Sequence, residues 1–353
     1  MNILDDYKNK RVLVTGHTGF KGTWLCHILK QSGAFVCGVS LNPNTNPALF
    51  DLAHGADGME SHIQDIRDYD ALLAVFHSFK PEIVFHLAAQ PIVRESYKSP
   101  RETYETNVMG TVNLMECVRQ TPSVKSVLNV TTDKVYQNRE WCWGYREDEP
   151  LDGFDPYSNS KSCSELVTHS YTKSFFNEMG INVSTARAGN VLGGGDFSVD
   201  RIIPDCVRAT VKGLPIQVRN PNSVRPYQHV LEPLFAYMMI ALRQLSDSSF
   251  SGSYNVGPDE ESCVTTGELV DLFVKDWGGK ASWNCGNAQG PHEANFLKLD
   301  CSKIKSKFGW KPQWDIWKAL EETVEWYRVW NDKGTIASCM DKQINEYLEQ
   351  KNA

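Results

Sequence analysis

The chain has 353 residues, 41% of them hydrophobic, and its formal net charge at pH 7 is −7. This length permits one large or two modest domains with a sizeable core. The acidic balance and the lack of a long basic run argue against a nucleic-acid or anionic-membrane partner, and the longest apolar run, LFAYMMIAL, is about half the length that crosses a bilayer.

Short β-branched runs alternate with helical patterns through the first half of the chain. Strands are predicted at 11–15, 34–40, 61–66, 82–89, 124–132 and 182–189. Helices are predicted between them, at 22–33, 68–80, 100–120 and 157–180. This alternation is typical of a Rossmann-type, doubly wound parallel sheet.

The sequence changes character after about residue 190, where glycines and then prolines become frequent. We therefore predict a dinucleotide-binding domain over 1–189 and a smaller α/β substrate domain, mainly over 190–335. A segment at about 226–260 is expected to return to the first domain. Residues 336–353 are expected to form a C-terminal tail.

A glycine-rich loop, VTGHTGFKG, lies between the first predicted strand and the first predicted helix. Gly16 would allow a tight turn, Gly19 would let the backbone approach a pyrophosphate, and Gly22 would let helix and strand pack closely. The amide groups of the helix N-terminus would then face the phosphates. The loop therefore predicts a dinucleotide site, to which we assign the rest of the loop as well: His17, Thr18, Phe20 and Lys21.

The end of the second predicted strand bears on the choice of cofactor. It continues as GVSLNPNTNP, with neither the acid that would bind a ribose nor an arginine that would bind a 2′-phosphate. This strand therefore leaves NAD and NADP open. After the third strand, Asp65 and Ile66 are expected to contact the adenine edge and face, although Asp65 could equally be an ordinary residue at a helix N-terminus.

Tyr157 and Lys161 are four residues apart and share one face of a predicted helix. A tyrosine with a pKa of about 10 must shift by about three units, or roughly 4 kcal/mol, to act as a base at neutral pH. One ammonium at about 4 Å supplies roughly that energy at an effective dielectric of about 20. Tyr157 is thus a candidate base for a substrate alcohol, and Thr132 could hydrogen-bond the same alcohol.

Several stretches together resemble the nucleotide-sugar dehydratases of the extended short-chain dehydrogenase/reductase family. They are GHTGFKGTWL, IVFHLAAQPIVR, TNVMGTVNLMECV, DKVYQNREWCWGYRE, DPYSNSK, RAGNVLGGGD, RNPNSVRPYQHVLEPL and PHEANFLKLDCSK. The resemblance implies a tightly held NAD and a homodimer or homotetramer. It also implies cofactor contacts from Tyr157, Lys161 and the end of the fourth strand, at Leu87, Ala88, Ala89 and Gln90.

The residues that follow Thr132 narrow the resemblance. The wider dehydratase family has Asp-Glu there, whereas this chain has Asp133 and Lys134, like the subgroup that acts on CDP-glucose. The resemblance implies oxidation at C4, loss of water across C5 and C6, and hydride return to C6 in deoxysugar biosynthesis. Asp133 and Lys134 match the acid and base of the elimination. Lys134 could act as a neutral base or as a charged stabiliser of the enolate, and the sequence leaves this open.

Candidate substrate contacts lie mainly in the second half of the chain. Arginine side chains suit phosphate oxygens, although each arginine could instead form a surface ion pair. Asn190 lies where the family contacts the sugar–phosphate side. The candidates are Asn190, Arg219, Arg225 and His229, with Arg94 and His292 as weaker ones.

The ten cysteines are scattered, without CxxC pairs or a Cys/His cluster, which predicts no metal site. Cys26, Cys37 and Cys117 fall within apolar patterns and are expected to be buried, in a reducing compartment. The N-terminal stretch MNILDDYKNKR lacks the apolar segment of a signal peptide. We therefore expect a cytoplasmic protein.

Two other functions are compatible with parts of this pattern. Another nucleotide-sugar 4,6-dehydratase or a 4-epimerase would share the loop, Tyr157 and Lys161, but an epimerase needs no acid–base pair at 133–134. A non-enzymatic NAD-binding regulatory protein would have no use for the Thr132, Tyr157 and Lys161 set.

Overall fold

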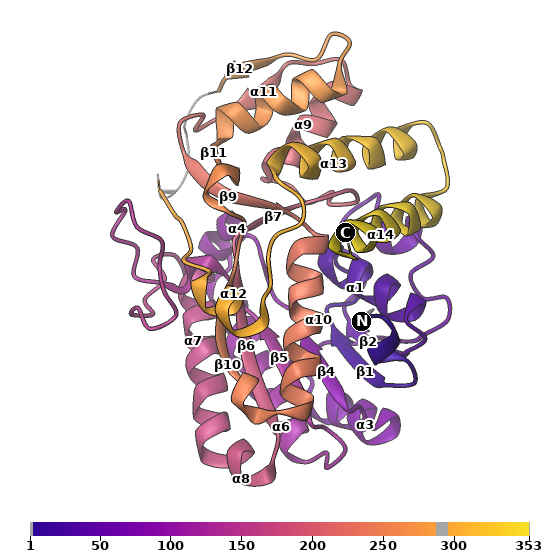
Figure 1. Cartoon of the computed structure of the whole chain (residues 1–353), viewed down its shortest axis with the longest axis vertical. Coiled ribbons are helices and arrows are strands. Elements are labelled where there is room, and N and C mark those ends of the chain that lie inside the picture. The colour runs from indigo at the N-terminus through magenta and orange to yellow at the C-terminus, as the bar shows by residue number, and fades with distance from the viewer. Residues whose placement is uncertain (1–2, 287–295, 353) are drawn as a thin grey trace.

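A seven-stranded sheet runs through the computed structural model, which describes residues 3–286 and 296–352 (Figure 1). Its strands are β1 (Arg11–Thr15), β2 (Phe35–Ser40), β3 (Glu60–Ile63), β4 (Ile83–His86), β5 (Ser126–Val130), β6 (Asn182–Ala188) and β10 (Gly252–Val256). They lie in the order β10-β6-β5-β4-β1-β2-β3, and every neighbouring pair is parallel. This is the doubly wound Rossmann order, so the predicted fold class is confirmed.

Helices cover both faces of the sheet. Helices α1 (Phe20–Gln31) and α10 (Leu231–Ser246) pack with Val12 and Val14 of β1 in one core. Helices α3 (Tyr69–Phe79) and α6 (Gly110–Arg119) pack with Leu13 in the other core. Side chains alternate between the faces of a strand, so a strand covered on both faces must be apolar throughout. The predicted apolar runs arise in this way.

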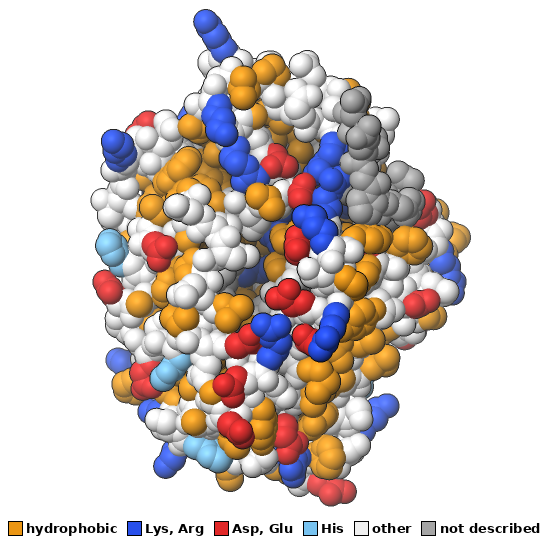
Figure 2. All heavy atoms as spheres, turned by 180° about the vertical axis from the view of Figure 1, so that it is seen from behind, with side chains coloured by type: hydrophobic (Ala, Val, Ile, Leu, Met, Phe, Trp, Pro, Cys, Tyr) orange, Lys and Arg blue, Asp and Glu red, His pale blue; other side chains and the backbone are white. Residues whose placement is uncertain are grey.

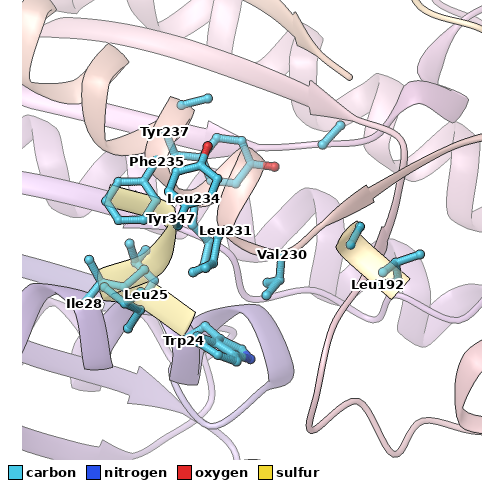
Figure 3. Close-up of a cluster of buried hydrophobic side chains, with 14 of the residues drawn as sticks. Trp24, Leu25, Ile28, Leu192, Val230, Leu231, Leu234, Phe235, Tyr237 and Tyr347 are labelled. Carbon is cyan, nitrogen blue, oxygen red and sulfur yellow. The ribbon is translucent and has the colours of Figure 1, made fainter. Parts of the chain in front are cut away.

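A cluster of buried apolar side chains packs on the inner face of α1. In Figure 3, Trp24 and Leu25 of α1 face Leu231 and Leu234 of α10, and Tyr347 of helix α14 (Ile336–Asn352) closes the cluster. Trp24 also donates from its indole to Gly194 O at 3.0 Å. Residues 336–352, which we predicted as a tail, therefore form a helix whose apolar side chains are buried in this core.

The strand predicted at 124–132 is shorter in the structure. Strand β5 ends at Val130, and Asp133–Val135 form a 3-10 turn for which Thr132 is the N-cap. The oxygen of the Thr132 side chain accepts a hydrogen bond from Lys134 N at 3.4 Å. A side chain that satisfies a local amide competes with strand pairing, which is why the strand stops before the threonine pair.

The two long predicted helices are each interrupted by a π turn. The first comprises α5 (Pro100–Tyr104), a π turn at Glu105–Met109 and α6, and the second comprises α7 (Pro156–Tyr171), a π turn at Thr172–Phe176 and α8 (Asn177–Met179). Asn107, inside the first π turn, donates to Gln90 O at 3.1 Å and to Ser160 Oγ at 2.9 Å. The turn therefore links α7 to the end of β4.

The second half of the chain adds two small sheets beside the large one. Strands β7 (Asn190–Leu192), β9 (Val224–His229) and β11 (Cys263–Thr265) form one, and β8 (Ile216–Val218) and β12 (Trp283–Cys285) form the other. Helix α10 and strand β10 lie instead in the layers of the large sheet (Figure 1). The remaining helices are α2 (Leu49–Leu52), α4 (Val93–Lys98), α9 (Ile202–Val211), α11 (Thr266–Trp277), α12 (Ser302–Phe308) and α13 (Ile316–Asn331).

Two expectations from composition can be compared with these elements. All ten cysteines are free thiols, and Cys26, Cys37 and Cys117 are buried as predicted. Among the described residues, each helix is too short or too polar to cross a membrane. The run LFAYMMIAL lies within α10, which packs on the large sheet.

Candidate functional site

A cleft of about 680 Å³ opens at the carboxyl ends of the sheet strands. The ends of β1, β4, β5 and β6 contribute to its lining, as do α7 and the start of α9. Figure 2 shows a hollow near the middle of one face, with Lys, Arg, Asp and Glu side chains gathered around it. Open α/β sheets bind ligands at this edge, beside the point where the strand order reverses.

The glycine loop forms one wall of this cleft. Gly16 has a positive φ of 78°, and Gly16 N donates to Val39 O at 2.8 Å. A Cβ at Gly16 would lie 2.7 Å from Ala88 N, and one at Gly22 would lie 2.0 Å from Gly16 O. These two glycines are thus required by backbone strain and by close packing, as a dinucleotide loop demands.

Replacing Gly22 with alanine is expected to prevent the loop from closing on α1, because the new methyl group would overlap the Gly16 carbonyl. We expect loss of nucleotide binding together with a lower free energy of unfolding. Gly19→Ala is the matched control for stability alone, since a Cβ there meets only Gly16 O at 3.4 Å, whereas its position beside the expected pyrophosphate makes it unsuitable as a control for binding. Isothermal titration with the dinucleotide and urea unfolding measure the two effects; an equal free energy of unfolding for the two variants would contradict the packing argument.

The other loop side chains do not all face the cleft. Thr18, Phe20 and Lys21 line it, whereas His17 does not. The His17 ring is buried, lies edge-on to Phe50 and has its Nε2 2.8 Å from Ser61 Oγ. Burial lowers the pKa of His17 to about 4. The side chain therefore packs against β2, β3 and α2 and does not face the cleft where a ligand contact was predicted.

Lys21 is a cation inside the cleft. Burial lowers its pKa to about 8, with further lowering from Arg201 and Lys161, while Asp133 and Asp196 act in the opposite direction. The sequence assigned Lys21 only to the phosphate loop. The fold brings its charge close to the predicted catalytic residues.

The predicted adenine contacts also lie in this cleft. Asp65 and Ile66 both line it, and Asp65 accepts hydrogen bonds from Arg67 Nε at 2.9 Å and from Arg67 N at 2.8 Å. Burial opposes ionisation of Asp65, but these bonds hold its pKa below the usual value. The four residues assigned after β4 also line the cleft: Leu87, Ala88, Ala89 and Gln90.

The structure brings Thr132, Tyr157 and Lys161 together at the middle of the cleft. Tyr157 lies in the first turn of α7, where Asp155 is the N-cap, and it shares a hydrogen bond with the side chain of Thr132. Lys161 lies one turn later and donates from Nζ to Val130 O at 3.1 Å. The two elements that meet here, α7 and the end of β5, therefore set the relative positions of all three groups.

The predicted lowering of the Tyr157 pKa is wrong for the groups that the chain itself supplies. Burial raises this pKa to about 12, and the Thr132 hydrogen bond and the charge of Arg201 oppose the rise only in part. The expectation based on Lys161 did not include the cost of taking a phenolate out of water, and the charge that chiefly opposes this cost is that of Arg201. Burial also lowers the pKa of Lys161, to about 8.

Replacing Lys161 with methionine is expected to stabilise the nucleotide-free protein at pH 7. The shift from 10.5 to about 8 corresponds to about 3 kcal/mol of burial cost, and the lost bond to Val130 O offsets about 1–2 kcal/mol of it. The gain should shrink as pH rises from about 8 to 10.5, because the folded wild-type lysine then loses its proton first. Urea unfolding at several pH values measures it; a variant less stable at every pH would contradict the buried-charge argument.

Asp133 and Lys134 lie beside this group and also line the cleft. Asp133 is buried; its Oδ1 accepts a hydrogen bond from Thr132 Oγ1 at 2.9 Å, and its Oδ2 has no partner among the described residues. Burial raises the pKa of Asp133, while Lys134, Thr132 and Arg225 act to lower it. A carboxyl group whose pKa is raised by burial and whose second oxygen is uncommitted is suited to general acid catalysis.

The predicted substrate residues divide into two groups. Asn190, Arg94 and Arg219 line the cleft, and both arginines lie near Asp200 Oδ1, at 3.8 Å for Arg94 Nε and 3.1 Å for Arg219 NH1. Arg225 is largely buried on β9, where its charge acts on Asp133. Arg225 thus lies nearer to the acid–base pair than the sequence indicated.

His229 does not fit the predicted substrate contact. It is fully buried, its ring lies 4.8 Å from that of Trp314 and 6.3 Å from that of Trp24, and Leu231 N donates to its Nδ1. It therefore belongs to the core between α1 and the C-terminal helices. His292, the other predicted histidine, lies outside the described residues.

Two ion pairs near the catalytic groups were missed by the sequence analysis. Arg201 NH1 binds Asp196 Oδ2 at 2.9 Å and its charge acts on Tyr157. Glu165 and Arg187 form a buried pair behind Thr131. The one available signal was that Glu165 lies eight residues after Tyr157, on the same helical face as Lys161.

Comparison with known proteins gives a consistent family. A family model described as GDP-mannose 4,6 dehydratase matches residues 13–323. The CDP-glucose 4,6-dehydratase of Salmonella typhimurium is 49% identical over 97% of this chain and 97% of its own length. A probable dTDP-glucose 4,6-dehydratase of Sinorhizobium fredii is 28% identical, covering 90% of this chain and 92% of its own.

Solved structures share the fold. The UDP-glucose 4-epimerase of Thermus thermophilus, in complex with NAD, has a TM-score of 0.78 and 25% identity, and covers 90% of this chain and 99% of its own. The dTDP-glucose 4,6-dehydratase of Bacillus anthracis, in complex with NAD, has a TM-score of 0.77 and 22% identity, with coverage of 92% and 98%.

Proposed function

The chain belongs to the GDP-mannose 4,6 dehydratase family, and on that premise we propose that it is an NAD-dependent CDP-glucose 4,6-dehydratase. The product would be CDP-4-keto-6-deoxyglucose. The observation that carries this proposal is the likeness over nearly the whole chain to a CDP-glucose 4,6-dehydratase. The cleft that gathers Thr132, Asp133, Lys134, Tyr157 and Lys161 supports it.

The glycine loop fits the dinucleotide, because Gly16 with its positive φ makes the tight turn and Gly22 lets α1 pack directly against the Gly16 carbonyl, which places the start of α1 at the cleft. Loop residues would bind the pyrophosphate, and Asp65, Ile66 and the 87–90 segment would contact the remainder. When bound, NAD would accept a hydride from C4 of the sugar and later return it to C6.

The chain's own side chains would move the protons. We assign removal of the sugar 4-hydroxyl proton to Tyr157, with Thr132 binding the same oxygen. Lys161, Arg201 and the positive nicotinamide would stabilise the phenolate, which burial alone disfavours. Asp133 would then protonate the departing 6-hydroxyl. Lys134 would remove the C5 proton as a neutral amine, or, if charged, would stabilise the enolate while a solvent water accepts that proton.

Arg94, Arg219 and Asn190 are the candidates for the nucleotide and its pyrophosphate. Asp200 lies near both arginines and offsets one of their two positive charges. A pyrophosphate would have to compete with that carboxylate, and it could do so because it offers more acceptor oxygens and more charge.

The test is to incubate purified protein with CDP-glucose without added cofactor and to analyse the product by mass. Loss of one water and the alkaline absorbance of a 4-keto sugar are expected. UDP-glucose and dTDP-glucose in parallel reactions test the base preference. An unchanged mass with a galactose epimer would support a 4-epimerase instead, and no turnover would contradict both enzymatic functions.

We also propose a cytoplasmic homodimer or homotetramer. The free thiols favour a reducing compartment. Met109, in the π turn that follows α5, is 51% exposed, and Leu166 of α7 is 55% exposed. These neighbouring elements therefore leave apolar surface that a second copy of the chain could cover.

Replacing Leu166 with glutamate is expected to shift the protein to monomers, because a charge would be buried wherever two copies pair α7. Light scattering after gel filtration measures the mass. Val211→Glu, at another exposed apolar position, is the control. A wild-type monomer would overturn the proposal.

A further inference from the structure

A buried ion pair lies next to the catalytic segment, and the mechanism above does not use it. Glu165 of α7 and Arg187 of β6 have side chains that are 0% and 1% exposed, and Oε2 of Glu165 lies 2.9 Å from NH2 of Arg187. A buried pair of this kind adds little net stability relative to apolar residues of similar size. The pair is therefore better explained by the groups that it holds in place than by its contribution to the free energy of unfolding.

The carboxylate of Glu165 binds two threonines besides the arginine. Thr131 Oγ1 donates to Oε1 at 2.5 Å, Thr185 Oγ1 donates to Oε2 at 2.7 Å, and Arg187 Nε donates to Oε1 at 3.0 Å. Burial alone would raise the pKa of Glu165, but Arg187 and these bonds hold it below the usual value. Glu165 is therefore an anion with all of its bonding capacity engaged.

Side chains of helix α7 form hydrogen bonds with three residues of the catalytic segment, residues 130–136. Lys161 donates to Val130 O at 3.1 Å, Ser162 donates to Val135 O at 2.8 Å, and Glu165 accepts from Thr131. The three bonded residues of the segment bracket Thr132, Asp133 and Lys134. The helix that carries Tyr157 therefore also fixes the segment that carries the other catalytic groups.

The ion pair also contacts the segment at its last residue, Tyr136. Arg187 NH1 donates to Tyr136 OH at 2.9 Å, and Tyr136 OH donates to Asn255 Oδ1 of β10 at 2.6 Å. One connected set of buried polar groups thus holds both Thr131 and Tyr136, the residues on either side of the 132–135 turn.

We infer that Glu165 is a positioning residue: acting through Thr131, it fixes Thr132 and Asp133 relative to Tyr157. This inference rests on the proposed function for its catalytic consequence. A displacement of about 1 Å in a reacting group can lower the rate by as much as about 100-fold. Because the chemistry needs groups from two elements, their relative position depends on contacts that join those elements.

The test removes the hydrogen bond between Thr131 and Glu165 and keeps the Glu165–Arg187 ion pair. Glu165→Gln would leave the Arg187 guanidinium buried without its counter-charge, so its effects could not be separated from misfolding. Thr131→Val removes one hydroxyl bond to Glu165. Thr185→Val is the matched control, because it removes another hydroxyl bond to the same carboxylate from a residue of β6 that lies outside the 131–136 segment. Thr131→Ser keeps the hydroxyl and should rescue.

The readouts are kcat and KM for CDP-glucose, urea unfolding, and amide hydrogen exchange of the 131–136 segment in the nucleotide-free protein. We expect Thr131→Val to lower kcat by about tenfold or more with KM little changed, and to speed exchange in that segment. Thr185→Val should lose similar stability without either effect, and Thr131→Ser should behave like the wild type.

The inference is overturned if Thr131→Val and Thr185→Val lose activity and exchange protection equally, or if neither changes the segment. A wild-type protein that does not dehydrate CDP-glucose would refute the proposed function instead. The exchange comparison between the two valine variants would then still decide whether Glu165 holds the segment.

Discussion

Tyr157→Phe is expected to lower kcat for CDP-glucose dehydration by about 1,000-fold, because general base catalysis at the first step contributes about 10²–10⁴-fold. The phenyl ring keeps the packing at the start of α7 and removes only the hydroxyl that would take the 4-hydroxyl proton. Near-ultraviolet absorbance of reduced nicotinamide, followed after mixing enzyme with substrate, reports that first step. It should not appear at the normal rate.

Tyr104→Phe is the matched control for this variant. Tyr104 lies in α5 and donates to Asn159 Oδ1 at 2.9 Å, so the same atom is removed and one hydrogen bond is lost. It lies outside the lining of the cleft. We expect normal turnover from it. Normal absorbance kinetics in Tyr157→Phe would show that another group removes the proton.

Lys134→Met is expected to uncouple oxidation from elimination. Tyr157, Thr132 and Lys161 stay in place, so reduced nicotinamide should form on mixing with CDP-glucose. Loss of water should then be slow, since neither a base nor a cation remains at C5. We expect a fall of about 10²–10³-fold in kcat. Stopped-flow absorbance and product mass analysis measure the two stages separately.

Lys134→Arg separates the two roles that the sequence left open. An arginine keeps the positive charge but stays protonated, so it can stabilise an enolate and cannot act as a base. Elimination that survives in Lys134→Arg and fails in Lys134→Met would identify a charged stabiliser. Failure of both would identify a neutral base. Unchanged dehydration in Lys134→Met would remove Lys134 from the mechanism.

Local pattern was sufficient for most of the first half of the chain. Strand β1 was predicted at its observed bounds, because a short β-branched run followed by a glycine loop has few other structures available. The end of β5 was missed by two residues. There a side chain, Thr132, satisfies a backbone amide, and propensity scales carry no information about such a bond.

The histidines show what local pattern leaves undecided. His17 lies in the glycine loop and His229 in a motif of the family, and both were predicted to contact ligands. Both are buried against aromatic rings from distant segments, Phe50 for His17 and Trp314 for His229. Position along the chain gives a residue's neighbourhood but not the direction of its side chain.

The sequence by itself determined the doubly wound sheet, the phosphate loop and the shared helical face of Tyr157 and Lys161, because each depends on spacing within a few residues. Only the tertiary structure decided the charge states. It half-buried Tyr157 and fully buried Asp133, brought Lys21 and Arg201 beside them, and placed the Glu165–Arg187 pair behind Thr131. Desolvation and Coulomb attraction depend on distances between groups far apart in the chain, and spacing along a sequence does not contain those distances.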